Sequence, residues 1–259
     1  MTVRVAVGGA TGKLGRVVCD KIAASYDLEL TGAVVSENGG HVGESIDGVI
    51  AVGPDGLDEV LRGCDVYVDL TTPAAASKTV ARVPRSGANL ILGTTSVDPD
   101  AIKEMTRNVE DYGTSALVSA NFEIGVNVFW KVCEMLARYL PDYDVEVVET
   151  HHAQKMDAPS GTAMEAVRRV QSVTGVDDVE YGRHGVTGPR SREICVHSIR
   201  AGDIVGDHTV IFAKNMERVE LTHKAISREA LADGCIESIR WMADRRDGRV
   251  HSMSEVLGL

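Results

Sequence analysis

The chain has few aromatic residues and a shortage of positive charge. Phenylalanine, tryptophan and tyrosine make up only 4% of its 259 residues, and 27 lysines and arginines stand against 38 aspartates and glutamates. The resulting net charge of −11 excludes a general nucleic-acid binder, because such proteins need a basic surface to neutralise phosphates. Any anionic ligand must therefore be held by a local positive site that acts against the field of the whole molecule.

Paired cysteines and long hydrophobic runs are also missing. The five cysteines are scattered without a C-x-x-C pair, so we expect reduced thiols and neither a disulfide framework nor a zinc site. The apolar runs are too short to cross a bilayer, so we expect no association with a membrane. The first residues form a strand pattern and not a signal peptide, which together with the reduced thiols favours a cytoplasmic protein.

Short apolar runs alternate with helical patterns over residues 1–121. Strands are expected at residues 3–7, 28–35, 65–70, 88–92 and 115–119, with a weaker strand at 49–52. Strands that alternate with helices form βαβ units and a parallel sheet. The expected fold class is therefore α/β, with a Rossmann-type parallel sheet in the first part of the chain.

A glycine-rich loop joins the first strand to the first helix. Gly9, Gly12 and Gly15 follow the spacing G-x-x-G-x-x-G, where glycine allows a tight turn and a close approach to a pyrophosphate. Ligands of parallel sheets bind beyond the carboxyl ends of the strands, and the alternative for each loop there is a polar turn without a ligand. The expected cofactor-binding residues are Gly9, Ala10, Thr11, Gly12, Lys13, Leu14, Glu37, Gly93, Thr94, Thr95, Ser119, Ala120, Asn121 and Phe122.

The residues after the second strand bear on the choice of cofactor. An acidic residue at this point usually holds the ribose diol of NAD, whereas a basic residue accommodates the phosphate of NADP. Glu37 therefore favours NAD, while Lys13 in the glycine loop is placed to reach a 2′-phosphate. We expect the protein to use both NADH and NADPH.

The pattern of elements changes near residue 122. A long helix is expected at 123–139 and an alternating strand at 143–150. Three further alternating strands, at 192–200, 204–213 and 218–223, are joined by short turns and predict an antiparallel or mixed sheet. The glycine-rich segment 173–190 is expected to be a mobile loop. We therefore expect a dinucleotide-binding domain of residues 1–121 and 222–259, and an α+β substrate-binding domain of residues 122–221.

Residues 149–163 concentrate polar side chains just before a helix. The run ETHHAQKMDAPSGTA contains His151, His152 and Lys155, and a helical pattern follows at 164–170. The free N–H groups and the dipole of a helix N-terminus favour an anion. The histidines titrate near neutral pH and the lysine offers a fixed positive charge. Together these groups suit an anionic substrate that must also accept a proton.

The same stretch admits structural interpretations. Adjacent residues on a strand point to opposite faces, so both histidines reach one ligand only if the strand ends there. Thr162 and Glu165 also fit a capping box. Two histidines without a third nearby ligand do not make a zinc site, so we expect no metal. His197, His208 and His223 lie on predicted strands and are most simply residues of the fold or of an interface.

These motifs together resemble one known family. The run HHAQKMDAPSGTA at residues 151–163 is similar to the signature of the dihydrodipicolinate reductases, the 4-hydroxy-tetrahydrodipicolinate reductases of lysine and diaminopimelate biosynthesis. Further similar motifs are GATGKLG at 9–15, VDLT at 68–71, GTT at 93–95, ANF at 120–122 and RAGDIVG at 200–206. The chain departs from the family pattern at Ser96, where glycine is usual, at Ser36 and Glu37, where a basic residue is common, and at Gln154, where some members have histidine.

The resemblance implies an activity and a set of roles. It implies NAD(P)H-dependent reduction of 4-hydroxy-tetrahydrodipicolinate to tetrahydrodipicolinate, in a homotetramer built on the sheet of the second domain. His151 would be the general acid, and Lys155 the second catalytic residue. The residues that bind the two carboxylates of the substrate would be His152, Lys155, Ser160, Gly161 and Thr162.

Two other functions fit the same motifs. One is a different two-domain amino-acid dehydrogenase or imine reductase that acts on an anionic substrate. The other is a non-catalytic regulator that binds a dinucleotide, which would leave the His-His-Lys stretch without a role.

Overall fold

The computed structural model describes residues 2–227 and 229–259, and these form two compact units. The first unit ends at Ile124 and resumes at Glu229, and the second begins at Gly125. The predicted limits, after residues 121 and 221, fall a few residues earlier along the chain. The later limit differs because the last strand of the second unit stays paired with its neighbour as far as Ala225.

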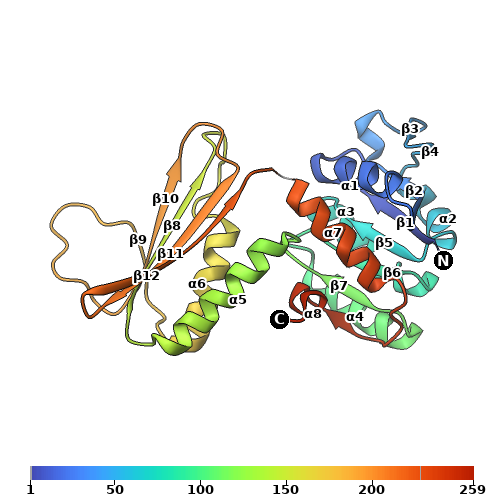
Figure 1. Ribbon diagram of the computed structural model, residues 1–259. Coiled ribbons are helices and arrows are strands. Elements are labelled where there is room, and N and C mark those ends of the chain that lie inside the picture. Colours follow the sequence, from blue (N-terminus) through green and yellow to red (C-terminus); the bar gives the residue numbers. More distant parts are fainter. Residues whose placement is uncertain (1, 228) are drawn as a thin grey trace. The chain divides into compact units, whose positions relative to one another are not determined.

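The first unit is built on a six-stranded sheet (Figure 1). Its strands are β1 (Val3–Gly8), β2 (Leu28–Val34), β5 (Val66–Asp69), β6 (Asn89–Leu92), β7 (Ala116–Val118) and β13 (Val250–His251). Their order is β13-β7-β6-β5-β1-β2, and every neighbouring pair is parallel. A small hairpin, β3 (Ser45–Ile46) and β4 (Val49–Ile50), pairs separately, and Val52 just after it forms a parallel bridge with Val34 of β2. The predicted Rossmann-type parallel sheet is confirmed.

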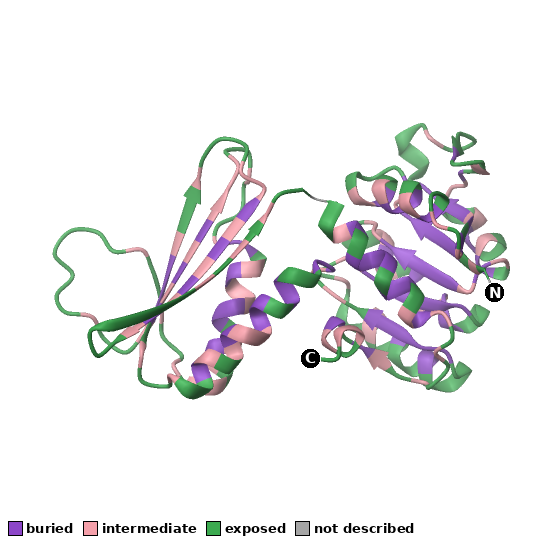
Figure 2. Ribbon diagram, viewed as in Figure 1, coloured by how far each residue is buried: buried purple, intermediate pink, exposed green. Residues whose placement is uncertain are grey.

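Helices cover both faces of the parallel sheet. They are α1 (Lys13–Ala23), α2 (Leu57–Arg62), α3 (Pro73–Thr79), α4 (Pro99–Tyr112), α7 (Glu229–Met242) and α8 (Met253–Leu257), with short 3-10 turns η1 (Glu37–Gly39), η2 (Pro54–Gly56) and η3 (Pro84–Ser86). Helices α1, α7 and α8 share a buried cluster with Val5 and Val7, whereas α2, α3 and α4 pack with Ala6. Alternate residues of a strand point to opposite faces, so β1 contributes to both clusters and is buried on both sides (Figure 2).

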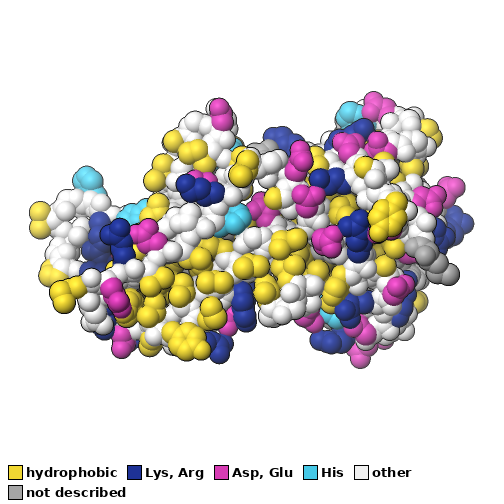
Figure 3. All heavy atoms as spheres, viewed as in Figure 1, with side chains coloured by type: hydrophobic (Ala, Val, Ile, Leu, Met, Phe, Trp, Pro, Cys, Tyr) yellow, Lys and Arg dark blue, Asp and Glu magenta, His cyan; other side chains and the backbone are white. Residues whose placement is uncertain are grey.

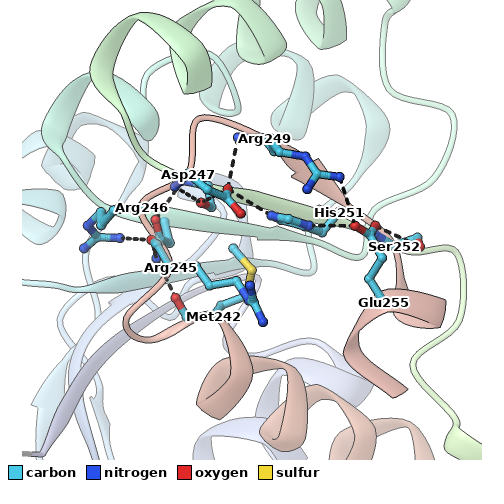
Figure 4. A network of polar contacts seen from close by, with 10 residues as sticks. Met242, Arg245, Arg246, Asp247, Arg249, His251, Ser252 and Glu255 are labelled. Atoms are coloured by element: carbon cyan, nitrogen blue, oxygen red, sulfur yellow. Dashed lines mark hydrogen bonds and ion pairs between the residues drawn. The ribbon is translucent and has the colours of Figure 1, made fainter. Parts of the chain in front are cut away.

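Polar contacts hold the C-terminal segment to this sheet (Figure 4). The buried side chain of Asn89 in β6 donates from Nδ2 to the carbonyl of Met242 at 2.6 Å. His251 of β13 lies between the carboxylates of Asp247 and Glu255, at 3.1 and 3.0 Å. These contacts explain why the last part of the chain belongs to the first unit.

The second unit holds a mixed five-stranded sheet (Figure 1). Its strands are β8 (Asp144–His151), β9 (Val179–Tyr181), β10 (Ile194–Arg200), β11 (Gly206–Lys214) and β12 (Glu217–Ala225). In the order β12-β11-β8-β10-β9, β10 is parallel to both of its neighbours and β11 is antiparallel to both of its own. With the helices α5 (Ile124–Tyr139) and α6 (Gly161–Thr174), this confirms the predicted α+β unit with a mixed sheet.

Two sequence predictions for the second sheet are wrong. Strands β10 and β11, expected to pair across a short turn, instead flank β8 on its two edges. A strand has two hydrogen-bonding edges, and the apolar residues Val145 and Val147 of β8 suit a central position. The segment 173–190, expected to be a mobile loop, contains β9, which pairs with β10.

Helices α5 and α6 pack on one face of the second sheet. Their side chains share a buried cluster with Val147 and Phe212, to which α5 contributes Phe129 and Trp130. The indole N–H of Trp130 donates to the carbonyl of Thr162 at 3.0 Å, which ties α5 to the first turn of α6. The start of α6 is therefore fixed by the core beneath it.

Helix α5 also carries an apolar stripe outside this core. Val128, Met135 and Tyr139 are exposed, the last with 80% of its surface accessible. Figure 3 shows hydrophobic side chains gathered along this helix on the face in view. Within residues 2–227 and 229–259, no helix has the length and apolar character needed to cross a membrane.

Candidate functional site

The predicted cofactor residues lie at one edge of the first sheet. Strands β2, β1, β5, β6 and β7 are parallel neighbours, so their carboxyl ends share an edge. Residues 9–14 follow β1, Glu37 opens η1 after β2, residues 93–95 follow β6 and residues 119–122 follow β7. The structure therefore brings together all the segments that the sequence suggested for a dinucleotide.

The glycine loop leaves the start of α1 open to an anion. Gly9 adopts φ +79°, and its N–H donates to the carbonyl of Val34 at 2.9 Å. A Cβ on Gly15 would lie 2.1 Å from the carbonyl oxygen of Gly9, so the helix packs directly on the loop. Gly12 caps α1 without a side-chain hydrogen bond, and no acidic residue lies in the first turn. Backbone N–H groups at such an end fit a pyrophosphate.

The groups that bear on cofactor choice are both exposed. Glu37 is the first residue of η1, and Lys13 is the first residue of α1. One offers a carboxylate for a ribose diol and the other a cation for a 2′-phosphate. Both side chains that the sequence singled out, the one favouring NAD and the one favouring NADP, are therefore exposed.

A buried carboxylate organises the same edge. Asp69, the fully buried last residue of β5, accepts hydrogen bonds from the hydroxyls of Thr71 at 2.7 Å, Thr79 at 3.0 Å and Thr94 at 2.8 Å. These contacts join the ends of β5 and β6 to α3. The hydroxyl of Thr94 therefore supports the loop, while its backbone remains part of the proposed cofactor edge.

Ser96 occupies a backbone position that suits glycine. Its φ is +56°, in the left-handed region, where a Cβ costs about 1–2 kcal/mol. Glycine is also more flexible when unfolded, which offsets about 0.5–1 kcal/mol. We therefore expect Ser96→Gly to raise the unfolding free energy of the first unit by about 0.5–1 kcal/mol in urea titrations.

A matched change at Ser36 tests whether backbone strain causes the stabilisation. Ser36 has φ −67°, where serine is unstrained, so Ser36→Gly should not stabilise the unit. A loss of stability in Ser96→Gly would show that the serine side chain contributes more than the backbone strain costs.

The inner face of the second sheet changes from apolar to polar along β8. Val145 and Val147 belong to the core, and Glu149 and His151 continue on the same face because side chains repeat every second residue. The neighbouring strands place Arg200 beside His151 and His208 beside Glu149. A polar layer thus closes the core at the end of β8 that leads to α6.

Glu149 is the centre of this layer and is fully buried. Its Oε2 lies 2.5 Å from Nδ1 of His151. The guanidinium of Arg200 donates to both carboxylate oxygens, at 2.9 and 2.8 Å, and the N–H of Ser160 donates to Oε1 at 3.2 Å. The carboxylate therefore accepts hydrogen bonds on both of its oxygens, from His151, Arg200 and Ser160.

These contacts decide the charge states of Glu149 and His151. Burial works to raise the pKa of Glu149, but hydrogen bonds from Arg200, Ser198 and His151 outweigh it and lower the pKa to about 2. Burial also lowers the pKa of His151 below its ordinary value, an effect that the Glu149 carboxylate opposes. Because an ionised carboxylate only accepts, Nδ1 of His151 carries the proton and Nε2 is the atom that gains and loses one.

His208 and Ser160 lie next to Glu149 in this polar layer. Burial, followed by the charge of His151, lowers the pKa of His208 to about 4, so the ring is neutral at pH 7. Oγ of Ser160 accepts from the N–H of Ala163 at 3.2 Å and lies 2.9 Å from Nε2 of His208. Ser160 is thus the N-cap of α6, and the capping box suggested for Thr162 is wrong. The N-cap uses only a lone pair of the Ser160 oxygen, so a substrate contact would use the O–H, which would then leave Nε2 of His208.

The remaining predicted substrate residues surround the start of α6. Strand β8 ends at His151, so His152 is already outside the strand and is half-buried. Nζ of Lys155 pairs with the carboxylate of Asp157 at 2.8 Å. Gly161 and Thr162 open α6, whose first turn holds no acidic residue. This segment therefore combines a cation with helix N–H groups.

A second polar group lies on the opposite face of the sheet. Among the described residues, Glu146, Cys195 and His197 have ligand atoms within 4.8 Å of one another. Nε2 of His197 is 2.7 Å from Oε2 of Glu146, and the guanidinium of Arg190 donates to the other oxygen. Because Arg190 already neutralises this carboxylate, the group is better suited to an ion-pair network than to a cation.

Sequence reasoning gives no role to Glu149, Arg200 or Asp69. Glu149 falls on the buried face of an alternating strand, and a charged residue at such a position is itself a signal of a paired carboxylate. Arg200 opens the RAGDIVG motif, but its partner lies 51 residues away. Asp69 ends an apolar strand, which is the usual place for a polar group at a ligand edge.

Comparisons with known proteins agree along the whole chain. Residues 3–122 match a family model described as dihydrodipicolinate reductase, N-terminus, and residues 125–257 match the model of its C-terminus. The 4-hydroxy-tetrahydrodipicolinate reductase of Methanocaldococcus jannaschii is 40% identical over 269 residues, covering 99% of this chain and 98% of that protein. The reductase of the same name from Methanobrevibacter smithii is 41% identical over 271 residues, with 99% of each chain covered.

Solved structures give the same result for the fold. A dipicolinate-bound dihydrodipicolinate reductase from Paenisporosarcina sp. TG-14 has a TM-score of 0.82 and 25% identity, covering 98% of this chain and 99% of that one. An engineered D-amino acid dehydrogenase bound to NADP+ shares the fold, with a TM-score of 0.58 and 18% identity over 98% of this chain and 94% of its own. Since two family models match in order and span nearly all of the sequence, the chain belongs to the dihydrodipicolinate reductase family of oxidoreductases.

Proposed function

We propose that this protein reduces 4-hydroxy-tetrahydrodipicolinate to tetrahydrodipicolinate with NADH or NADPH, in lysine and diaminopimelate biosynthesis, and that His151 is the proton donor. The observation that carries the proposal is the hydrogen bond of Nδ1 of His151 to a buried carboxylate, next to the start of α6. It leaves Nε2 to exchange the proton. The names of the similar proteins and the dipicolinate bound to one of them support the choice of substrate.

The proposed reaction needs one hydride and one proton. The named substrate first loses its 4-hydroxyl group as water, which leaves a conjugated C=C–C=N system, and the dinucleotide, when bound, would supply the hydride to that system. Electron density then builds up as an enamine, and Nε2–H of His151 protonates the neighbouring carbon. Lys155 stabilises the negative charge and assists this protonation. A positioned imidazole contributes about 10²–10⁴-fold in such a step.

The two substrate carboxylates are assigned to the groups around α6. Lys155 and His152 would bind one, which requires Lys155 to exchange its exposed partner Asp157 for the ligand. The hydroxyls of Ser160 and Thr162 and the N–H groups of Gly161 and Thr162 would hold the other, while the Ser160 oxygen also caps the helix start. We propose that the first unit binds the cofactor and that the second binds substrate and assembles a homotetramer through its sheet, in the cytoplasm.

The test is a reductase assay with freshly made 4-hydroxy-tetrahydrodipicolinate. We expect loss of absorbance at about 340 nm, the reduced nicotinamide band, with this compound and not with oxo acids. Turnover of oxo acids instead would favour another amino-acid dehydrogenase or imine reductase. Tight cofactor binding without turnover of either substrate would favour a dinucleotide-binding regulator.

We expect dual use of the two cofactors. Glu37 favours the ribose diol of NADH and Lys13 the phosphate of NADPH, so neither should be strongly preferred. The kcat/KM values for NADH and NADPH should differ by less than about 100-fold, which corresponds to about 2.7 kcal/mol. Steady-state kinetics with each cofactor give the ratio, and a larger preference for NADPH would contradict the expectation.

A further inference from the structure

We infer that Glu149 and Arg200 are positioning residues that fix the proton donor His151 and the start of α6 relative to each other. The inference rests on the proposed role of His151 and extends it to two residues that do not touch the substrate in that proposal. Its physical content is that a single buried carboxylate connects the acid with the anion-binding helix end.

His151, Arg200 and Ser160 all act as hydrogen-bond donors toward Glu149. Oε2 receives Nδ1–H of His151 and one guanidinium N–H of Arg200, while Oε1 receives the other guanidinium N–H and the backbone N–H of Ser160. Only an ionised carboxylate accepts at all four positions. The amide of a glutamine at this position would point its two N–H groups at other donors, whichever way the amide was turned.

These contacts reach from the acid to the helix. Ser160 is the N-cap of α6, so its bond to Glu149 fixes the first turn that would hold a substrate carboxylate. Arg200 also donates to the carbonyl of Asp157 at 2.7 Å, which ties the loop between the acid and the helix to β10. A shift of the Glu149 carboxylate would therefore move His151 and the proposed anion site together.

The surrounding charges give Glu149 a second effect, because its negative charge favours the protonated form of His151. Four charged or titratable groups face His151. They are Glu149 on its own strand, Lys155 on the following loop, Arg200 on β10 and His208 on β11. The rings of His208 and His151 meet edge to face, with their centroids 5.1 Å apart. Glu149 is the only anion among these four. Desolvation by burial already lowers the pKa of His151, and Lys155 and Arg200 lower it further. Without the Glu149 charge, the imidazolium loses the interaction that favours it.

The variant Glu149→Gln tests the inference by the pH profile of kcat. The protonated acid is the active form, so kcat falls as pH rises through the pKa of His151 in the enzyme–substrate complex. Removing a neighbouring charge should move this descending limb to lower pH by about 1–3 units, and kcat above it should fall at least about tenfold. A merely structural loss would lower kcat without moving the limb.

Glu146→Gln is the matched control. Glu146 lies on the same strand and also meets a histidine and an arginine, His197 and Arg190, but on the opposite face of the sheet. Its replacement should leave the descending limb in place. A comparable shift in this control would show that the effect is not specific to Glu149.

A measurement on the unmodified protein covers the case in which Glu149→Gln does not fold. With ¹⁵N-labelled histidine, neutral His151, identified by its absence from the spectrum of His151→Gln, should be protonated at Nδ1 and not at Nε2. Protonation at Nε2, or an unchanged limb in folded Glu149→Gln, would overturn the inference. Absence of reductase activity in the unmodified protein would instead refute the proposed function, and the tautomer would still be measurable.

Discussion

A His151→Gln variant is expected to bind NADH and NADPH normally and to lose about 10²–10⁴-fold in kcat. Glutamine is close in size and keeps a polar contact with Glu149, but it has no proton to give at neutral pH. The predicted cofactor residues belong to the other unit, so cofactor affinity should stay the same. Single-turnover reduction, followed by nicotinamide absorbance, measures the chemical step directly.

The pH dependence of kcat and kcat/KM gives a second test of His151, with a predicted direction. Burial lowers the pKa of His151 in the free enzyme, so the descending limb of kcat/KM should lie below pH 6.5, the ordinary value. A bound dicarboxylate adds negative charge that favours the imidazolium, so the limb of kcat should lie at higher pH than that of kcat/KM. Both limbs should disappear in His151→Gln.

His197→Gln is the control for this variant. His197 is also bonded to a glutamate, but it lies on the other face of the sheet. It should keep kcat and both limbs. If His151→Gln keeps kcat within about twofold of the unmodified enzyme, far short of the contribution of a general acid, another group donates the proton.

The parallel sheet could be predicted because its signals are local. The strands β1, β2, β5, β6 and β7 are short, mostly apolar runs that follow one another with helices between most of them, whereas the two-residue β13 has no such pattern and was not predicted. The glycine loop is likewise contained in seven consecutive residues, 9–15. Such patterns need only the periodicity of the chain, without knowledge of which strands meet.

The order of the second sheet depends on contacts between distant segments. The turn at residues 201–203 suggested a hairpin, yet β8 lies between β10 and β11. This insertion is what brings Arg200 and His208 to the two sides of Glu149. The carboxylate centre of the site therefore could not be predicted from spacing, although the histidines and the lysine beside it could.

Glycines show the same division between local and distant causes. Gly15 was predicted from the loop motif, and its Cβ would meet Gly9, six residues away. Gly234 in α7 carries no motif, but a Cβ there would lie 1.7 Å from the carbonyl oxygen of Phe122. A glycine inside a helix costs about 1 kcal/mol relative to alanine, which is the only hint in the sequence that another backbone approaches.

The largest effect on cofactor binding is expected from Gly15→Ala. The added Cβ would lie 2.1 Å from the carbonyl oxygen of Gly9 and 2.8 Å from its carbonyl carbon, both backbone atoms that no rotamer change can move. Helix α1 must therefore shift by about 1 Å, which costs about 1–3 kcal/mol of stability as overpacking. Loss of one hydrogen bond to a phosphate, about 1.5–3 kcal/mol, weakens cofactor binding by about 10–100-fold.

Two measurements separate these consequences, because stability and cofactor affinity need not change together. Urea unfolding reports the first, and titration of NADH and NADPH by nicotinamide fluorescence reports the second. Gly63→Ala is the control, since a Cβ at the C-cap of α2 meets its nearest atom at an ordinary 3.7 Å. A Gly15→Ala protein that binds both cofactors as tightly as the control would show that the start of α1 does not hold the pyrophosphate. A protein that loses affinity while Gly63→Ala keeps it would support the glycine loop as the anion site, independently of the chemistry in the second unit.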